Sequence, residues 1–143
     1  MAVKSAVGLN NKIFMRNYAA DRMGHKIDGK IDDISDMEYN RISNDYLEDL
    51  GDELDLISED HTDMDFDLSQ GVLTLNTKNG TYVINRQPPN KQIWLSSPIS
   101  GPNRYDLING KWASLRDNGR LTDLLSHELS QTYNDTIELQ LEN

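Results

Sequence analysis

The sequence predicts an α+β fold, a two-layer sandwich in which an N-terminal and a C-terminal helix pack on one face of an antiparallel β-sheet. Three observations lead to this prediction. An amphipathic helical pattern covers residues 36–59, short alternating segments separated by turn residues follow it, and a second helical pattern begins near Thr122. This order is typical of α+β domains, and 143 residues suit one domain with a modest core.

The N-terminal residues differ in charge from the rest of the chain. Residues 1–18 hold three basic and no acidic residues, a composition that mitochondrial import recognises. Arg16 and Tyr18 fit a matrix-peptidase site, which predicts cleavage after Tyr18. The alternative is an ordinary disordered tail. Residues 19–34 are mostly polar and predict a flexible lead-in to a single domain at 35–143.

The predicted first helix has two opposite faces. Apolar residues between Ile42 and Ile57 recur at steps of three and four, which predicts one buried stripe. Ser35 and Glu38 have the spacing of a capping box. Gly51 in the middle should cost roughly 1 kcal/mol relative to alanine, so the helix depends on packing. The opposite face carries six acidic residues, Asp45, Glu48, Asp49, Asp52, Asp55 and Glu59.

After His61 the period of the pattern changes to two. Apolar residues alternate with Asp63, Asp65 and Asp67, which predicts a strand with one apolar and one acidic face. Turn signals, including Gly101-Pro102-Asn103, separate the further predicted strands at 72–77, 81–85, 91–96, 105–107 and 112–115.

A second helix is predicted to start at Thr122, a good N-cap residue, and to end near Asn134. Residues 136–141 alternate in polarity and are expected to dock on the domain. Because the strands separate acidic from apolar residues, we expect both helices to cover one sheet face and the other face to stay solvated.

The negative charge is concentrated in one part of the chain. From Asp36 to Asp67 there are thirteen acidic residues and a single base, Arg41, whereas acids and bases balance from Leu68 onward. Acidic side chains three and four positions apart on a helix repel one another. Such a surface attracts cations and basic partners and repels nucleic acid and anionic lipid. A surface kept for solubility is the plainer alternative.

Because this chain has no cysteine, any metal must be held by oxygen or imidazole ligands. An open carboxylate face gives one or two ligands per ion, which predicts weak, unselective binding of hard cations. An EF-hand is disfavoured: Asp63, Asp65 and Asp67 match its first ligands, but Leu68 and Thr74 replace the required glycine and glutamate. His61, just after the acidic helix, is a further candidate metal ligand. No apolar run is long enough to span a bilayer.

A second candidate site surrounds Trp94. In a regular strand Asn90, Gln92 and Trp94 would share one face, with Arg104 nearby, and a tryptophan beside amides and an arginine is typical of a protein-contact patch. The alternative is that Trp94 is a core residue.

Several segments together resemble the frataxin family. They are Tyr82–Asn85, Pro89–Pro98 and Ser100–Asp106, with further similarity at Asp45–Leu47, Leu68–Leu75 and Leu121–Leu125. The resemblance covers about residues 39–133 and looks closest to fungal members. Leu56 stands where some relatives have another acid, and the segment 61–66 is shorter than in some fungal members.

The resemblance implies a sandwich of two helices on an antiparallel sheet and residence in the mitochondrial matrix. It implies weakly bound ferrous or ferric iron on Asp45, Glu48, Asp49, Asp52, Asp55, Glu59, Asp63, Asp65 and Asp67. It also implies docking on the cysteine desulfurase and the iron-sulfur scaffold protein through Asn90, Gln92, Trp94 and Arg104, with ferrochelatase as a further candidate partner.

Two functions from different classes follow from the resemblance. The first is a non-catalytic iron chaperone or regulator of iron-sulfur cluster assembly, monomeric, with neither nucleic acid nor a membrane as partner. The second is a ferroxidase and iron-storage protein that oxidises ferrous iron with oxygen and forms iron-dependent oligomers.

Overall fold

The structure is a computed structural model that describes residues 31–142, so the predicted targeting segment and residues 19–30 lie outside the described residues. The elements are α1 (Asp36–Ser58), β1 (Asp65–Ser69), β2 (Val72–Thr77), β3 (Gly80–Gln87), the short 3₁₀ helix η1 (Pro88–Asn90), β4 (Gln92–Ser97), β5 (Gly101–Ile108), β6 (Lys111–Ala113) and α2 (Leu121–Tyr133). The predicted α+β class is confirmed.

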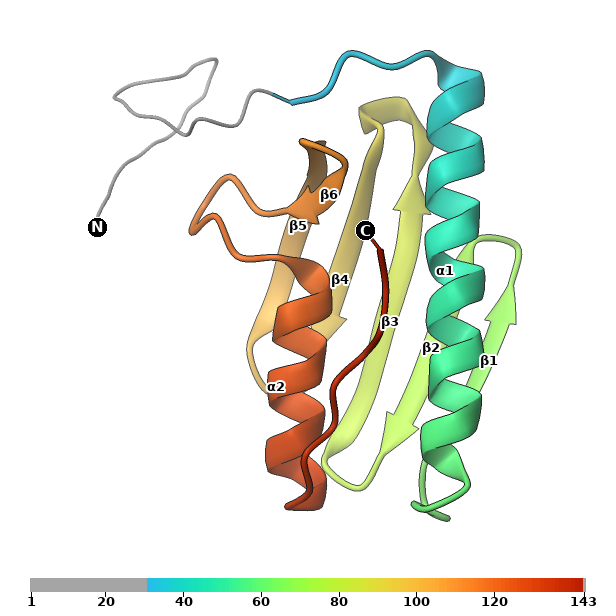
Figure 1. Ribbon diagram of the computed structural model, residues 1–143, viewed down its shortest axis with the longest axis vertical. Helices are drawn as coiled ribbons and strands as arrows, with labels where there is room; N and C mark the ends of the chain where they lie inside the picture. The colour runs from blue at the N-terminus through green and yellow to red at the C-terminus, as the bar shows by residue number, and fades with distance from the viewer. Residues whose placement is uncertain (1–30, 143) are drawn as a thin grey trace.

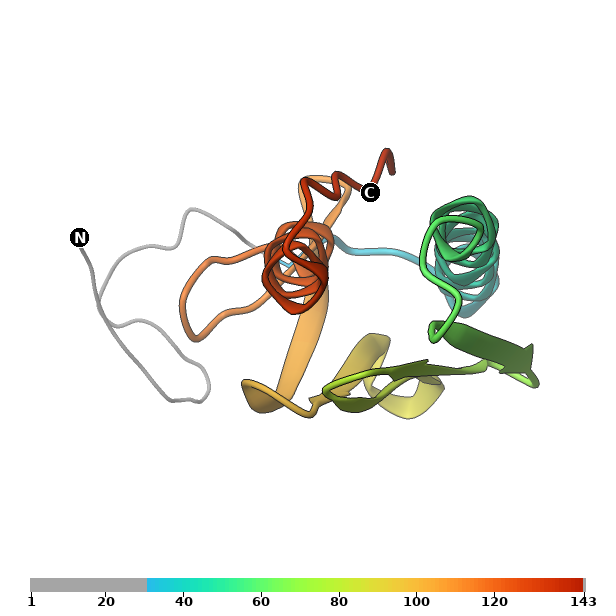
Figure 2. The same cartoon turned by 90° about the horizontal axis from the view of Figure 1, so that it is seen from below.

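The six strands form one antiparallel sheet in the order β1-β2-β3-β4-β5-β6, so each strand pairs with its neighbour along the chain (Figure 1). Figure 2 shows both helices on the same side of this sheet. The register aligns Val72 with Asn85, Asn85 with Trp94, and Trp94 with Arg104 across four strands. These side chains share the sheet face opposite the helices, because the intervening Ile84 and Ile93 point into the core.

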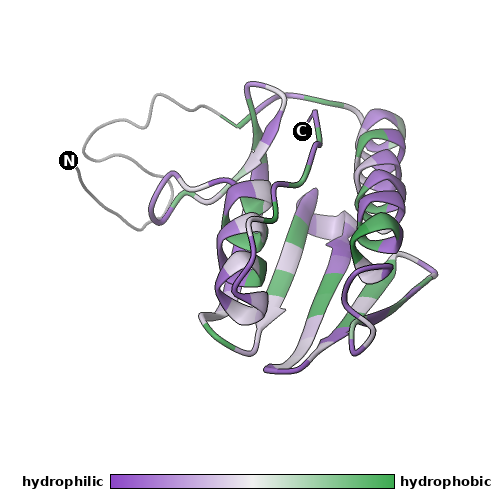
Figure 3. Cartoon of the chain, turned by 60° about the horizontal axis from the view of Figure 1, so that its bottom comes forward, coloured by the Kyte–Doolittle hydropathy of each residue, from purple (hydrophilic) through white to green (hydrophobic). Residues whose placement is uncertain are grey.

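Helix α1 begins and packs as the sequence predicts. The Ser35 hydroxyl accepts a hydrogen bond of 3.1 Å from the backbone N–H of Glu38, and the Glu38 carboxylate accepts one of 3.3 Å from the backbone N–H of Ser35. The buried stripe extends one turn beyond the prediction, to Tyr39. Figure 3 shows hydrophilic and hydrophobic residues alternating along α1 and along the strands.

The core lies between the sheet and the helices. The fully buried ring of Trp112 from β6 meets Tyr39 and Tyr46 edge-on, with ring centroids 6.2 Å and 6.5 Å apart. The aromatic quadrupole favours such edge-to-face pairs over a face-to-face sandwich of the rings. The sheet thus holds α1 through aromatic contacts.

The predicted role of Thr122 as the N-cap of the second helix is wrong. Arg120 occupies the N-cap position, without a side-chain capping bond, and Thr122 lies inside the helix and is buried. Its hydroxyl lies 2.8 Å from the hydroxyl of Tyr46, so Thr122 joins α2 to α1. The helix ends where expected, with Asn134 in the left-handed conformation.

The predicted turn at residues 101–103 is also wrong, because these residues form the start of β5. The turn lies just before them, where the Ser97 hydroxyl accepts hydrogen bonds from the backbone N–H groups of Ile99 and Ser100. Pro102 fits a strand here because β6 pairs only with Asp106–Ile108 and leaves this part of β5 unpaired on one side.

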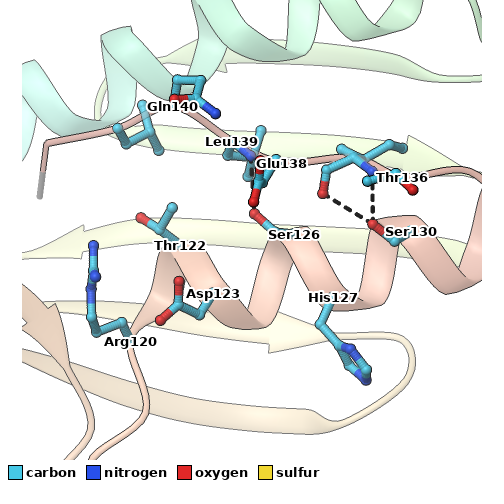
Figure 4. A pocket seen from close by; sticks show the side chains of 12 residues that line it. Arg120, Thr122, Asp123, Ser126, His127, Ser130, Thr136, Glu138, Leu139 and Gln140 are labelled. Atoms are coloured by element: carbon cyan, nitrogen blue, oxygen red, sulfur yellow. Dashed lines mark hydrogen bonds between the residues drawn. The ribbon is translucent and has the colours of Figure 1, made fainter.

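Both ends of the described chain are attached to the domain. Asp32 accepts hydrogen bonds of 2.9 Å and 2.8 Å from the backbone N–H groups of Asn109 and Gly110. At the other end, Ile137 and Leu139 are buried, which confirms the predicted docking of the tail. Figure 4 shows the tail beside α2, where Ser126 and Ser130 bind its backbone and both segments line an open, shallow pocket.

Candidate metal-binding and docking sites

The first candidate site is the acidic ridge, which we define as five acidic side chains on the outer face of α1 together with that of its C-cap residue, Glu59. All six are exposed: Asp45, Glu48, Asp49, Asp52, Asp55 and Glu59. Arg41 forms an ion pair of 3.8 Å with Asp45 at the N-terminal end of the ridge, with both side chains more than half exposed. The last turn of α1 has no basic residue. The negative charge therefore grows less compensated toward the C-terminal end of the helix.

The ridge is electrostatically unfavourable for the isolated chain. Asp52 has acidic neighbours at i−4, i−3 and i+3, and each like-charge pair at these spacings costs a few tenths of a kcal/mol. Asp55 and Glu59 also lie near the negative end of the helix macrodipole. A bound cation would relieve both kinds of repulsion.

The structure separates the acids of β1 from the acidic ridge. The ring of Phe66 lies 3.4 Å from where a Cβ of Gly51 would stand, so the Phe66 side chain faces α1. Alternation along the strand then directs Asp65 and Asp67 to the opposite sheet face, where both are exposed. Asp63 lies in the turn before β1 and is exposed.

Within the described residues, no three histidine or acidic side chains are grouped closely enough to enclose a metal ion. The acidic ridge therefore offers one or two carboxylates per ion, with water completing the shell. His61 turns away from the ridge: its Nε2 lies 3.4 Å from a carboxylate oxygen of Asp135, and its ring lies 4.5 Å from that of Tyr133.

The second candidate site is the Trp94 patch, which we define as Gln92, Trp94 and Arg104 on the open face of the sheet. Trp94 and Gln92 are half-buried and the neighbouring Ile93 is buried, as alternation predicts. The indole N–H of Trp94 donates a hydrogen bond of 2.7 Å to the side-chain oxygen of Gln92. The guanidinium of Arg104 lies 5.2 Å from the Trp94 ring centroid, within cation–π range.

Asn90 does not share the strand geometry of this patch. It is the last residue of η1, and the next residue, Lys91, adopts the left-handed conformation with a φ of 52°. The side chain of Asn90 is exposed in the connection between β3 and β4. The predicted alternation therefore holds for Gln92 and Trp94 but does not reach Asn90.

Sequence reasoning missed Asp106, which adjoins the Trp94 patch. The side-chain amide of Gln92 donates hydrogen bonds of 3.1 Å and 3.3 Å to its two carboxylate oxygens. Asp106 is 4% exposed, and this burial raises its pKa to about 6 against the opposing effects of Gln92 and Arg104. The sequence signal that could have found it is its position two residues after Arg104, which places both side chains on the same face of the strand.

Comparison with known proteins decides the family. The model of the frataxin-like domain matches residues 32–135. The chain belongs to the frataxin family. The mitochondrial frataxin homolog of Saccharomyces cerevisiae is 55% identical over 97 residues, 66% of this chain and 56% of that protein. The chain thus spans little more than half the length of this relative. The homolog of Schizosaccharomyces pombe is 43% identical over 75% of this chain and 71% of its own length.

Solved frataxin structures share the fold. A trimeric frataxin from S. cerevisiae, solved in complex with ferrous iron, superposes with a TM-score of 0.62 at 54% identity, covering 66% of this chain and 87% of that one. A frataxin from Psychromonas ingrahamii, 27% identical, has a TM-score of 0.64 and covers 76% of this chain and 100% of that one.

Two further sequence predictions concern the mitochondrial location and the lack of a membrane-spanning segment. The fungal relatives are named as mitochondrial, in agreement with the predicted mitochondrial location. In the part of the chain that the structure describes, neither helix is long and apolar enough to cross a membrane.

Proposed function

We propose that this frataxin binds ferrous iron weakly on its acidic ridge and promotes iron-sulfur cluster assembly in the mitochondrial matrix. In this proposal the Trp94 patch docks on the complex of cysteine desulfurase and scaffold protein. The acidic ridge delivers the iron or meets a basic surface of that complex. The observation that carries the proposal is the row of six exposed carboxylates on α1 with Arg41 as the one base beside it.

Iron binding is supported by the chemistry and by a relative. Carboxylate oxygen is a suitable ligand for hard cations, and the mutual repulsion along the acidic ridge favours their capture. The S. cerevisiae frataxin structure contains ferrous iron. The open geometry predicts that several ions bind with low affinity at overlapping positions along α1, because each ridge carboxylate from Asp45 to Asp55 has at least two acidic neighbours three or four positions away.

Docking through the Trp94 patch is supported by its prearranged geometry. Trp94 is held from one side by Gln92 and lies beside the guanidinium of Arg104. Tryptophan and arginine are among the residues that contribute most to binding at protein interfaces. Side chains that are already held in place lose little conformational entropy when a partner binds.

The test of iron binding is an anaerobic ferrous titration followed by NMR. In the wild-type chain we expect resonances of residues 45–59 to broaden or shift first. The triple variant Asp52→Asn, Asp55→Asn, Glu59→Gln should lose this response. A matched control, Asp123→Asn, Glu138→Gln, Glu142→Gln, removes the same charge from exposed positions elsewhere and should respond like the wild type. An equal loss in both variants would show that net charge, not the ridge, attracts the iron.

The test of docking is the Trp94→Ala variant. It should abolish the stimulation of cluster synthesis by the desulfurase and scaffold while leaving the ferrous titration unchanged. A variant that stimulates as well as the wild type would disprove docking through this patch without affecting the proposal for iron.

A ferroxidase and iron-storage function is the second candidate, favoured by the trimeric state of the S. cerevisiae structure. It requires oxygen uptake on iron addition and growth of the particle size with the iron-to-protein ratio. Oxygen electrode measurements and light scattering at severalfold iron excess separate the candidates, because a chaperone stays monomeric and consumes no oxygen beyond the rate of free iron.

A further inference from the structure

A chain of side-chain hydrogen bonds crosses from β5 to the Trp94 ring. Asp106 and Gln92 face each other in the register of β5 and β4, and Trp94 follows Gln92 by two residues on the same face. The Gln92 side chain lies between the other two, with its nitrogen 3.1 Å from Asp106 and its oxygen 2.7 Å from the indole nitrogen. The three groups form a linear relay that ends on the exposed part of the ring.

Only one orientation of the Gln92 amide satisfies both neighbours. The indole N–H of Trp94 is a donor alone, so it requires the amide oxygen. The carboxylate of Asp106 is an acceptor when ionised, so it requires the amide NH₂. Removing the acceptor at Asp106 would leave the amide free to rotate and would release the indole.

We infer that Asp106 is a positioning residue of the Trp94 patch, which acts through Gln92 to hold the indole ring in the orientation that the docking partner meets. This inference deepens the proposed docking function and rests on it. Asp106 itself is 4% exposed and does not reach the partner, so its effect on docking is indirect.

The relay also limits what the partner can recognise. Because Gln92 already accepts the indole N–H, Trp94 offers the partner its ring carbons and not a hydrogen-bond donor. The exposed Arg104 beside the ring supplies the positive charge and the N–H donors. The complementary surface is therefore an apolar contact next to a carboxylate or a carbonyl oxygen.

The burial of the Asp106 carboxyl supports a functional reason for its presence. Asp106 lies on the open face of the sheet and is buried, and its register partner in β6, Ala113, is buried too. An apolar side chain could fill the same space. Burial disfavours its ionised form, as its raised pKa records. A group that is unfavourable for folding and yet ordered by two amide contacts suits a positioning role.

The test compares Asp106→Leu, which removes the acceptor, with Asp106→Asn, which keeps a carbonyl oxygen for Gln92. The first readout is the indole N–H resonance of Trp94 and its hydrogen exchange rate, with the indole of the fully buried Trp112 as internal reference for folding. In D106L we expect the Trp94 resonance to move and its exchange to accelerate by about tenfold, as for one lost hydrogen bond, while Trp112 stays unchanged. In D106N both signals of Trp94 should remain near those of the wild type.

The second readout is the affinity for the purified desulfurase–scaffold complex. D106L should bind about tenfold more weakly, and D106N should bind nearly as well as the wild type. The inference is overturned if D106L keeps the wild-type indole signal or affinity, or if D106N loses as much as D106L. Should D106L fail to fold, Gln92→Met breaks the same relay, and an unmoved Trp94 resonance in that variant overturns the inference.

Trp94→Ala separates this inference from the proposed function. If W94A binds the complex like the wild type, docking through the patch is wrong, whatever the Asp106 variants do. If W94A loses binding and D106L does not, the docking proposal survives and the positioning role of Asp106 fails.

Discussion

The hydroxyl of Tyr82 in β3 donates a hydrogen bond of 2.8 Å to the buried carboxyl of Glu128 in α2. The same carboxyl oxygen accepts a bond of 2.7 Å from the Ser97 hydroxyl of β4. One side chain of α2 thereby fixes the helix to two central strands, within a core whose other members are mostly apolar.

Replacing this carboxyl should show how much of the helix docking depends on it. Glu128→Ala leaves two buried hydroxyl groups without an acceptor, and we expect the free energy of unfolding to fall by about 2–4 kcal/mol. Glu128→Gln keeps an oxygen for both hydroxyls and should lose less than half of that. Urea titrations of the two variants measure the difference. Equal losses would show that the charge of Glu128, and not its role as a hydrogen-bond acceptor, stabilises the protein.

Gly51→Ala should stabilise the protein. The nearest atoms to an added methyl group would belong to Phe66 and Leu68, at 3.4 Å and 3.9 Å, which is ordinary van der Waals contact. Alanine is favoured over glycine in a helix interior by about 1 kcal/mol, so we expect the melting temperature to rise by a few degrees. A lower melting temperature would mean that Phe66 and Leu68 of β1 cannot shift to accommodate the added methyl group.

Neutralising one acid of the ridge should also raise stability, in a way that salt removes. Asp55→Asn relieves repulsion from Asp52 and Glu59 and from the helix end, which we expect to add about 0.5 kcal/mol at low ionic strength and little at 1 M salt. Asp123→Asn is the matched control, because Asp123 lies in the first turn of α2, where a negative charge is favourable. The control should change stability with the opposite sign.

Asp106 predicts a pH dependence of stability. Its pKa is raised from 3.8 to about 6 in the folded state, so between these values the folded protein binds more protons than the unfolded chain. Stability therefore falls as the pH rises through this window, by about 3 kcal/mol for this group, and stays lower above it. Asp106→Asn should remove this slope and make the protein more stable at pH 7 than the wild type. Urea unfolding of both proteins at pH 4 and pH 7 tests this. If the free energy of unfolding changes by the same amount between the two pH values in the wild type and the variant, the prediction is wrong.

The elements that the sequence predicted well are those with local causes. The periodicity and capping box of α1, the alternation that buries Ile93 and places the half-buried Trp94 on the open face, and the Asn134 helix end all depend on residues within a few positions of one another. The residues that the sequence placed wrongly depend on distant contacts. Thr122 has the chemistry of an N-cap, but its partner Tyr46 lies 76 positions away.

The same distinction between local and distant causes applies to the candidate sites. The acidic ridge could be read from the sequence because one helix carries all six of its residues. The separation of Asp65 and Asp67 from that ridge could not, because it depends on which face of β1 packs against Gly51. Asp106 was missed because its link to Trp94 passes through Gln92 on another strand, and only the register of β4 with β5 brings them together.

The strand order has a consequence for how the protein folds. Because every strand pairs with the next one along the chain, the whole sheet can form by closing short loops, whose entropic cost is small. The contacts between α1 and α2 join opposite ends of the chain and require the longest closure. Low contact order within the sheet favours rapid folding, and we expect the two helices to complete the core as the late step of the reaction.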